Sequence, residues 1–153
     1  MIEKIEFDYE PGYYSGSTNL KNIKIVFTPT EVLYDAEFFD EEMNDIPYEE
    51  KHWIKKISKD DFNLLASKID ECLNIPNSYE HYVAECTYIR VEYDDCKHNT
   101  IEVYGNFSNY KCLSCVVRIV EGIIGGKYLL PSMKYYDNNY VNALNLKLRS
   151  KGC

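Results

Sequence analysis

The chain has 153 residues, of which 45% are hydrophobic and 27% charged, and its formal net charge is −8. These values predict one globular domain spanning residues 1–153, large enough to bury a substantial core. The negative charge argues against direct binding of nucleic acid or of an anionic membrane surface. No apolar run approaches the roughly 20 residues that a membrane-spanning helix needs, and no secretion signal is evident. The expected location is therefore the cytoplasm, with all six cysteines reduced.

The charge is unevenly distributed along the chain. Residues 1–50 carry 13 acidic and 3 basic side chains, a net charge of −10, whereas residues 51–153 carry 12 acidic and 14 basic side chains, a net charge of +2. An asymmetry of this size bears on the kind of partner rather than on the fold. It predicts that an acidic surface built by the first third of the chain attracts a basic protein.

Alternation of apolar and polar residues predicts three strands in the first third, over residues 2–10, 22–28 and 32–39. A loop rich in glycine, serine and asparagine separates the first two, and a short turn separates the others, so the three form an antiparallel meander. One face of the first strand is expected to be acidic, with Glu6, Asp8 and Glu10 pointing outward. A further short strand is expected over residues 51–58.

The remainder predicts two helices and a strand pair. Ser58 is expected to cap a helix that runs to Leu73, because two aspartates follow it and apolar residues recur at helical spacing. Strands are expected over residues 87–93 and 100–105, joined by a turn over 94–99. A second helix is expected over residues 111–124, ended by the Gly125–Gly126 pair, and a last one over 138–149. The predicted class is α+β: a mostly antiparallel sheet, with an N-terminal meander and a later hairpin, and two main helices packed on it.

Residues 37–50, here called the acidic segment, have the most distinctive composition in the chain. Half of them are carboxylates, none is basic, and aromatic residues lie between the charges. A solubilising loop and a recognition surface both fit this pattern. For recognition, dense negative charge would attract arginine and lysine clusters, and the aromatic side chains would add apolar contacts. The predicted partner-binding residues are Glu37, Phe38, Phe39, Asp40, Glu41, Glu42, Asp45, Tyr48, Glu49 and Glu50, helped by Glu6, Asp8 and Glu10.

In general character the chain resembles the small acidic α+β proteins that bacteria and phages use as stoichiometric antagonists. This resemblance is one of class and involves no specific motif. It implies a non-enzymatic inhibitor, of the anti-CRISPR or anti-restriction type, that blocks a basic protein which handles nucleic acid, such as a nuclease. A toxin-immunity protein is the alternative within the same class. Neither function requires a cofactor or a metal.

A thiol- or zinc-dependent enzyme is the alternative from a different class. Its residues would be Cys96, His98, Cys112 and Cys115, since thiolates and imidazoles are the ligands of tetrahedral zinc. A Cys-x-x-Cys pair at a helix start can also act in redox chemistry. However, Cys112 and Cys115 fall on the apolar stripe of the predicted second helix, where a free cysteine acts as a small hydrophobic side chain. The sequence therefore favours a core role for these two thiols.

Overall fold

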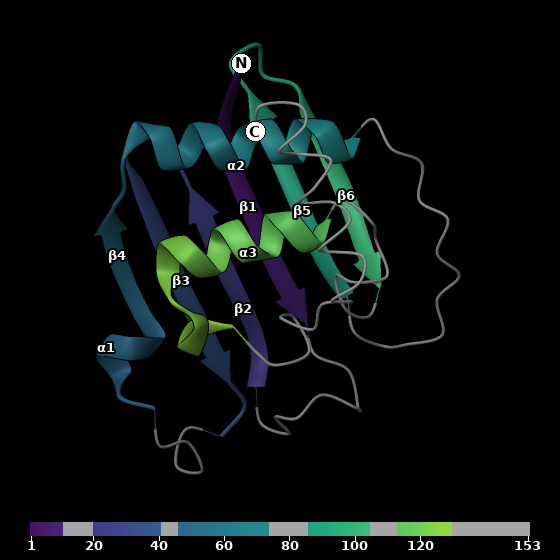
Figure 1. Cartoon of the computed structure of the whole chain (residues 1–153). Helices are drawn as coiled ribbons and strands as arrows, with labels where there is room; N and C mark the ends of the chain where they lie inside the picture. The colour runs from purple at the N-terminus through teal and green to yellow at the C-terminus, as the bar shows by residue number, and fades with distance from the viewer. Residues whose placement is uncertain (11–19, 41–45, 74–85, 105–112, 130–153) are drawn as a thin grey trace.

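The computed structural model describes residues 1–10, 20–40, 46–73, 86–104 and 113–129, and its sheet dominates the fold (Figure 1). Six strands form one sheet in the order β4-β3-β2-β1-β5-β6, and every neighbouring pair is antiparallel. The predicted α+β class with a mostly antiparallel sheet is therefore confirmed. The strands are β1 (Ile2–Glu10), β2 (Leu20–Phe27), β3 (Glu31–Phe38), β4 (His52–Lys56), β5 (Cys86–Tyr93) and β6 (His98–Tyr104).

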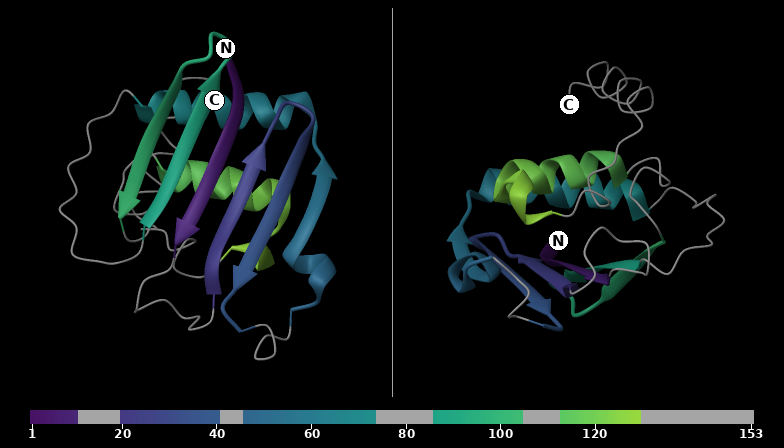
Figure 2. Two further views of the ribbon diagram at one scale, coloured as in Figure 1. Left: turned by 180° about the vertical axis from the view of Figure 1, so that it is seen from behind. Right: turned by 90° about the horizontal axis from the view of Figure 1, so that it is seen from below.

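Two long helices cover one face of this sheet. They are α2 (Lys59–Leu73) and α3 (Leu113–Ile124), and both run across the strands on the same side (Figure 1). A single-turn helix, α1 (Tyr48–Lys51), precedes β4, and a 3-10 turn, η2 (Gly126–Tyr128), follows α3. None of the described helices lies on the opposite face, which we call the open face (Figure 2). One solvated face is usual for an antiparallel sheet.

The first strand lies inside the sheet rather than at its edge. β1 pairs with β2 on one side and with β5 on the other, so residues about 80 positions apart meet, such as Phe7 and Ile89. The helix α2 connects β4, at one edge, to β5, on the far side of β1. Local periodicity identifies strands but cannot specify this crossover.

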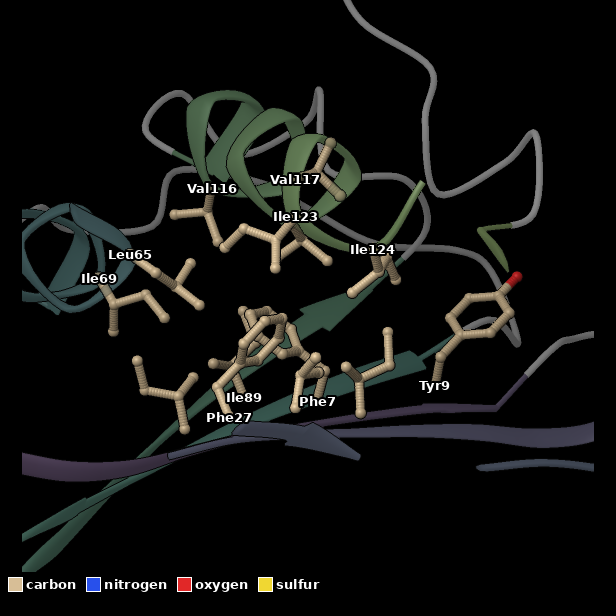
Figure 3. Close-up of a cluster of buried hydrophobic side chains, with 14 of the residues drawn as sticks. Phe7, Tyr9, Phe27, Leu65, Ile69, Ile89, Val116, Val117, Ile123 and Ile124 are labelled. Carbon is tan, nitrogen blue, oxygen red and sulfur yellow. The ribbon is translucent and has the colours of Figure 1, made fainter. Parts of the chain in front are cut away.

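The core lies between the helix-covered face of the sheet and the two long helices (Figure 3). Alternate residues of β1 and β2 point into it, as the period-two pattern predicts. From the other side, Leu65 and Ile69 of α2 and Val116 and Ile123 of α3 point toward the sheet. Burial of these side chains is the main source of stability, at about 25 cal/mol for each Å² of apolar surface removed from water.

The capping residue predicted for the first long helix is confirmed. The backbone N–H of Asp61 donates to the Ser58 Oγ at 3.1 Å, which satisfies one of the unpaired amides at the helix start. The strand predicted over residues 51–58 is only partly correct, because β4 is limited to His52–Lys56 and Lys51 ends α1. The sequence pattern does not predict α1, because one helical turn is too short to show an apolar period.

The end of α3 depends on a glycine in a left-handed conformation. Gly125 has φ of 97°, and its N–H donates to the carbonyl of Glu121 at 2.8 Å. Replacement of Gly125 by Ala is expected to lower the free energy of unfolding by about 1–2 kcal/mol, because a Cβ is strained there. Urea denaturation measures the change. Gly126→Ala is the matched control and is expected to stay within roughly 0.5 kcal/mol, since its added Cβ meets only ordinary contacts. Equal losses for both variants would contradict this prediction.

Some other element boundaries differ from the expected ones by only a few residues. The turn between β5 and β6 is shorter than residues 94–99, because β6 already begins at His98. Cys96 has φ of 65° in this turn, and its N–H donates to the carbonyl of Tyr93. The helix expected over 138–149, the loop between the first two strands and the first two residues of the helix expected over 111–124 lie outside the described residues.

Candidate protein-binding end of the sheet

The acidic segment lies at the end of the sheet where β3 stops and α1 leads into β4. Leu20, the first residue of β2, pairs with Phe38 at the same end, and β1 also finishes there (Figure 1). Chain connections at a strand end are common sites of recognition, because a rigid sheet positions them. Of the predicted contact residues, Glu41, Glu42 and Asp45 lie outside the described residues.

Large apolar side chains of this segment are exposed to solvent. Phe39 is 74% exposed and Tyr48 is 67% exposed, and Ile46, between them in sequence, is exposed as well. A phenylalanine exposed to this degree buries little area in the folded chain, so its contribution to folding is small. Exposed aromatic residues bordered by polar ones are typical of protein-binding surfaces. A loop that only keeps the protein in solution does not require such side chains.

Phe38 has a different environment from its neighbour. Its ring is partly buried against the core, and the ammonium group of Lys51 lies 5.2 Å from the ring centroid. Lys51 itself is buried, which is unusual for lysine. The contact between Phe38 and Lys51 thus links the end of β3 to α1 inside the fold. Phe38 therefore supports the acidic segment from its inner side and offers less contact surface than Phe39. Nothing in the local sequence indicated that Lys51 would be buried.

The carboxylates of the segment differ in their partners. Glu50 accepts a hydrogen bond from the Lys127 amine at 2.8 Å, which ties α1 to η2. Glu37 lies 3.9 Å from the Lys21 amine, with both side chains largely exposed. Glu49 is exposed and forms no ion pair with any described residue. Asp40 is also exposed, so these carboxylates are accessible to a partner from solvent.

The acidic residues of β1 are in a different setting. Glu6 is only 15% exposed and lies 2.7 Å from the Lys24 amine, on the open face. Asp8 accepts a hydrogen bond from the Asn22 side-chain amide at 3.4 Å. Glu10, the last residue of β1, is exposed at the end of the sheet where β3 also stops, with β2 between the two strands. Neighbouring strands therefore pair Glu6 and Asp8, and Glu10 is the one residue of this row placed at the candidate site.

The Lys24–Glu6 pair predicts a pH effect. Its hydrogen bond and charge attraction raise the pKa of Lys24 above the ordinary value of 10.5. A raised lysine pKa stabilises the fold fully below pH 10.5, and this stabilisation is lost as the pH rises through the folded-state pKa. Lys24→Gln is expected to cost less than about 1 kcal/mol at neutral pH, because the amine is partly exposed, and the difference from the parent should shrink in alkali.

Urea denaturation between neutral and strongly alkaline pH measures this difference. Lys21→Gln is the control, since Lys21 and Glu37 are 3.9 Å apart and both exposed. A difference between the Lys24 variant and the parent that grows with pH would contradict the assignment of the pair.

An aromatic cluster anchors the edge of the sheet next to the site. The Trp53 and Tyr34 rings stack with centroids 5.2 Å apart, and Tyr128 of η2 lies 5.0 Å from each of them. The Tyr34 hydroxyl donates to the carbonyl of Tyr128 at 2.9 Å, and burial raises the pKa of this hydroxyl, so it stays protonated. Trp53, considered from the sequence as either a contact or a core residue, is packed against the helix-covered side.

The candidate thiol and imidazole residues lie on different elements. Cys96 and His98 are exposed at the turn between β5 and β6, where they line a shallow pocket with Lys97. Cys115 is buried in α3, and burial raises the pKa of its thiol. Cys112 lies outside the described residues. Within the described ranges, no three His, Cys, Asp or Glu side chains lie close enough together to hold a metal ion.

One cysteine differs from the expectation that all are reduced. Cys72, on the buried side of α2, is disulfide-bonded. The expectation followed from the predicted cytoplasmic location, and spacing along the sequence does not show which cysteines a fold brings together.

None of the described helices is long and apolar enough to cross a membrane.

No protein-family model, curated protein or solved structure matches this chain. The case for a function therefore depends on the residues themselves.

Proposed function

We propose that this protein is a non-enzymatic inhibitor that binds a basic, nucleic-acid-handling protein through the acidic segment. The observation that carries the proposal is the exposure of Phe39, Ile46 and Tyr48 within a segment dominated by carboxylates. Apolar contacts would supply affinity, and the surrounding negative charge would accelerate association with a basic surface and favour that surface over others.

The distribution of ion pairs supports this choice of surface. On the open face, Glu6 pairs with Lys24, and Glu92 lies near both Lys4 and Arg90. A partner would gain little net charge attraction there, since charges of both signs already compensate one another. At the acidic segment, Glu49 is without an ion pair among described residues, and Glu37 has only a distant one. Exposed Glu3 and Glu31 lie elsewhere on the sheet, but the carboxylates at this end lie in one segment with exposed Phe39 and Tyr48.

The partner class follows from the chemistry of the segment. A row of carboxylates presents to arginine and lysine the same kind of charge that phosphates do, so the surface that fits it is one that normally contacts nucleic acid. Blocking such a surface requires occupancy and no catalysis. An inhibitor of the phage anti-defence type, against a CRISPR or restriction nuclease, meets this description, and a toxin-immunity protein is the alternative.

Competition binding tests the proposal. The intact protein is used to capture partners at low and moderate salt, the captured protein is identified by mass, and duplex DNA or RNA is then added as competitor. We expect a basic partner that nucleic acid displaces. Capture of a partner without nucleic-acid-binding activity, displaced by no nucleic acid, would instead support an immunity role toward a toxin that is not a nuclease.

A further inference from the structure

The strand β4 forms one edge of the described sheet, and no described strand pairs with the backbone groups on its outer side. Alternate residues of an antiparallel strand direct both backbone groups toward the same neighbour. The Ile57 N–H donates to the Thr30 carbonyl, so the residues two and four positions before it also face β3. His52, Ile54 and Lys56 therefore direct their backbone groups away from the sheet.

One of these outward groups is already occupied. The His52 N–H donates to the carbonyl of Tyr48 and ends α1. The N–H and C=O groups of Ile54 and Lys56, and the C=O of His52, remain on the outer side, where none of the described strands lies. An edge of this kind can accept a further strand.

The side chains of this edge include an exposed apolar pair. Ile54 is 63% exposed, and its cross-strand partner Leu33 is exposed as well, both on the open face. Among the exposed large apolar residues in the described ranges, Ile54 is the one that lies on an edge strand. Natural edges are usually protected by lysine. Here the Lys55 amine turns to the helix-covered side and donates to the Ile123 carbonyl, so Lys56 is the lysine of β4 that remains exposed on the same face as Ile54.

The charges along this edge change sign from one end to the other. The start of the edge is acidic, with Glu49 in α1, and its finish is basic, with Lys56 and Lys59. If the β4 strands of two copies paired in parallel, like charges would face each other. In an antiparallel arrangement, each acidic start lies beside the basic finish of the other edge.

We propose that β4 pairs antiparallel with β4 of a second copy of this chain, about a two-fold axis at Ile54. Ile54 then contacts Ile54 of the second copy, with a Leu33 on each side, and the two sheets become continuous. The available groups form two hydrogen bonds between the Ile54 residues and one from each Lys56 N–H to the opposite His52 carbonyl. This arrangement brings the α1 end of each chain, with Glu49, to the same end of the interface as Lys56 and Lys59 of the other. A two-fold interface of this kind is self-complementary and closed.

Sedimentation equilibrium of the intact chain tests the proposal. We expect twice the chain mass of 18.0 kDa for the parent and the single mass for Ile54→Lys, which places a charge at the axis. Leu64→Lys is the matched control, because Leu64 is also an exposed apolar residue but lies on α2, and it should remain dimeric. A parent of single mass, or an Ile54→Lys variant of double mass, would overturn the proposal.

Two further variants keep the test decisive if Ile54→Lys does not fold. Ile54→Pro removes the outward N–H without touching a bond to β3, so it should give a folded monomer. Glu49→Lys should weaken the dimer, and the added Lys59→Glu should restore it. Failure of this restoration would show that the register is wrong. The dimer and the proposed inhibitor function share Glu49, but the Ile54 variants test the dimer alone, because Ile54 lies outside the acidic segment.

Discussion

Reversal of Glu37, Asp40 and Glu49 to Lys is expected to lower the affinity for a basic partner by about a hundredfold or more. All three carboxylates are exposed in the acidic segment. Like charges placed against each other across an interface cost several kcal/mol, and about 1.4 kcal/mol corresponds to a factor of ten. The variant should also lose most of the salt dependence of binding, because that dependence arises from the attraction it removes.

A matched variant separates the position of the charges from their number. Reversal of Glu3, Glu31 and Asp70 to Lys changes the net charge from −8 by the same amount, on carboxylates that are also exposed but lie away from the acidic segment. Titration calorimetry with the captured partner, at low and moderate salt, measures both variants. Affinity that falls equally in both would mean that net charge alone attracts the partner. Affinity unchanged in the first variant would remove the acidic segment from the interface.

Replacement of Phe27 by Ala is expected to lower the free energy of unfolding by about 3–5 kcal/mol. The Phe27 side chain is fully buried on the helix-covered face of β2, and its ring meets the Phe7 ring edge-to-face with centroids 5.9 Å apart. The substitution removes the transfer free energy of the ring and leaves a cavity between the sheet and the helices. Because a domain has only about 5–15 kcal/mol of stability, this single change is a large fraction of the total.

Urea denaturation monitored by circular dichroism measures the loss. Leu64→Ala is the control, since Leu64 is half exposed on α2, and it should change stability by roughly 0.5 kcal/mol or less. Phe27→Leu gives an intermediate value if the alanine variant does not fold. A Phe27→Ala variant as stable as the control would show that the core is not centred on the contact between β2, β1 and the helices.

The folding core and the acidic segment are separate parts of the molecule. The helix-covered face of the sheet holds the fold together, and the connection at the end of β3 presents charge and aromatic side chains to solvent. Exposed Phe39 and buried Phe27 have the same chemistry, but only the second contributes substantially to folding. Loss of binding without loss of stability is therefore the expected signature of changes in the acidic segment.

Sequence alone determined the class and most elements of this protein, because local patterns reflect local geometry. Period-two alternation identified β1 and β2, and the Ser58 cap and Gly125 marked the ends of two helices. These signals depend on backbone groups within a few residues, so they can be recognised without the rest of the fold. Composition likewise identified the acidic segment.

Only the tertiary structure decided which acidic residues remain available. In the sequence, Glu6 and Glu49 are equivalent carboxylates, but the pairing of β1 with β2 brings Lys24 to Glu6, whereas no described residue pairs with Glu49. The sequence likewise did not show that Lys51 is buried next to the Phe38 ring, or that Ile54 lies on an edge strand. Each depends on which strands become neighbours, and that choice is made by packing between residues far apart in the chain. Local patterns therefore predicted the elements, and long-range packing decided which of their side chains can meet a partner.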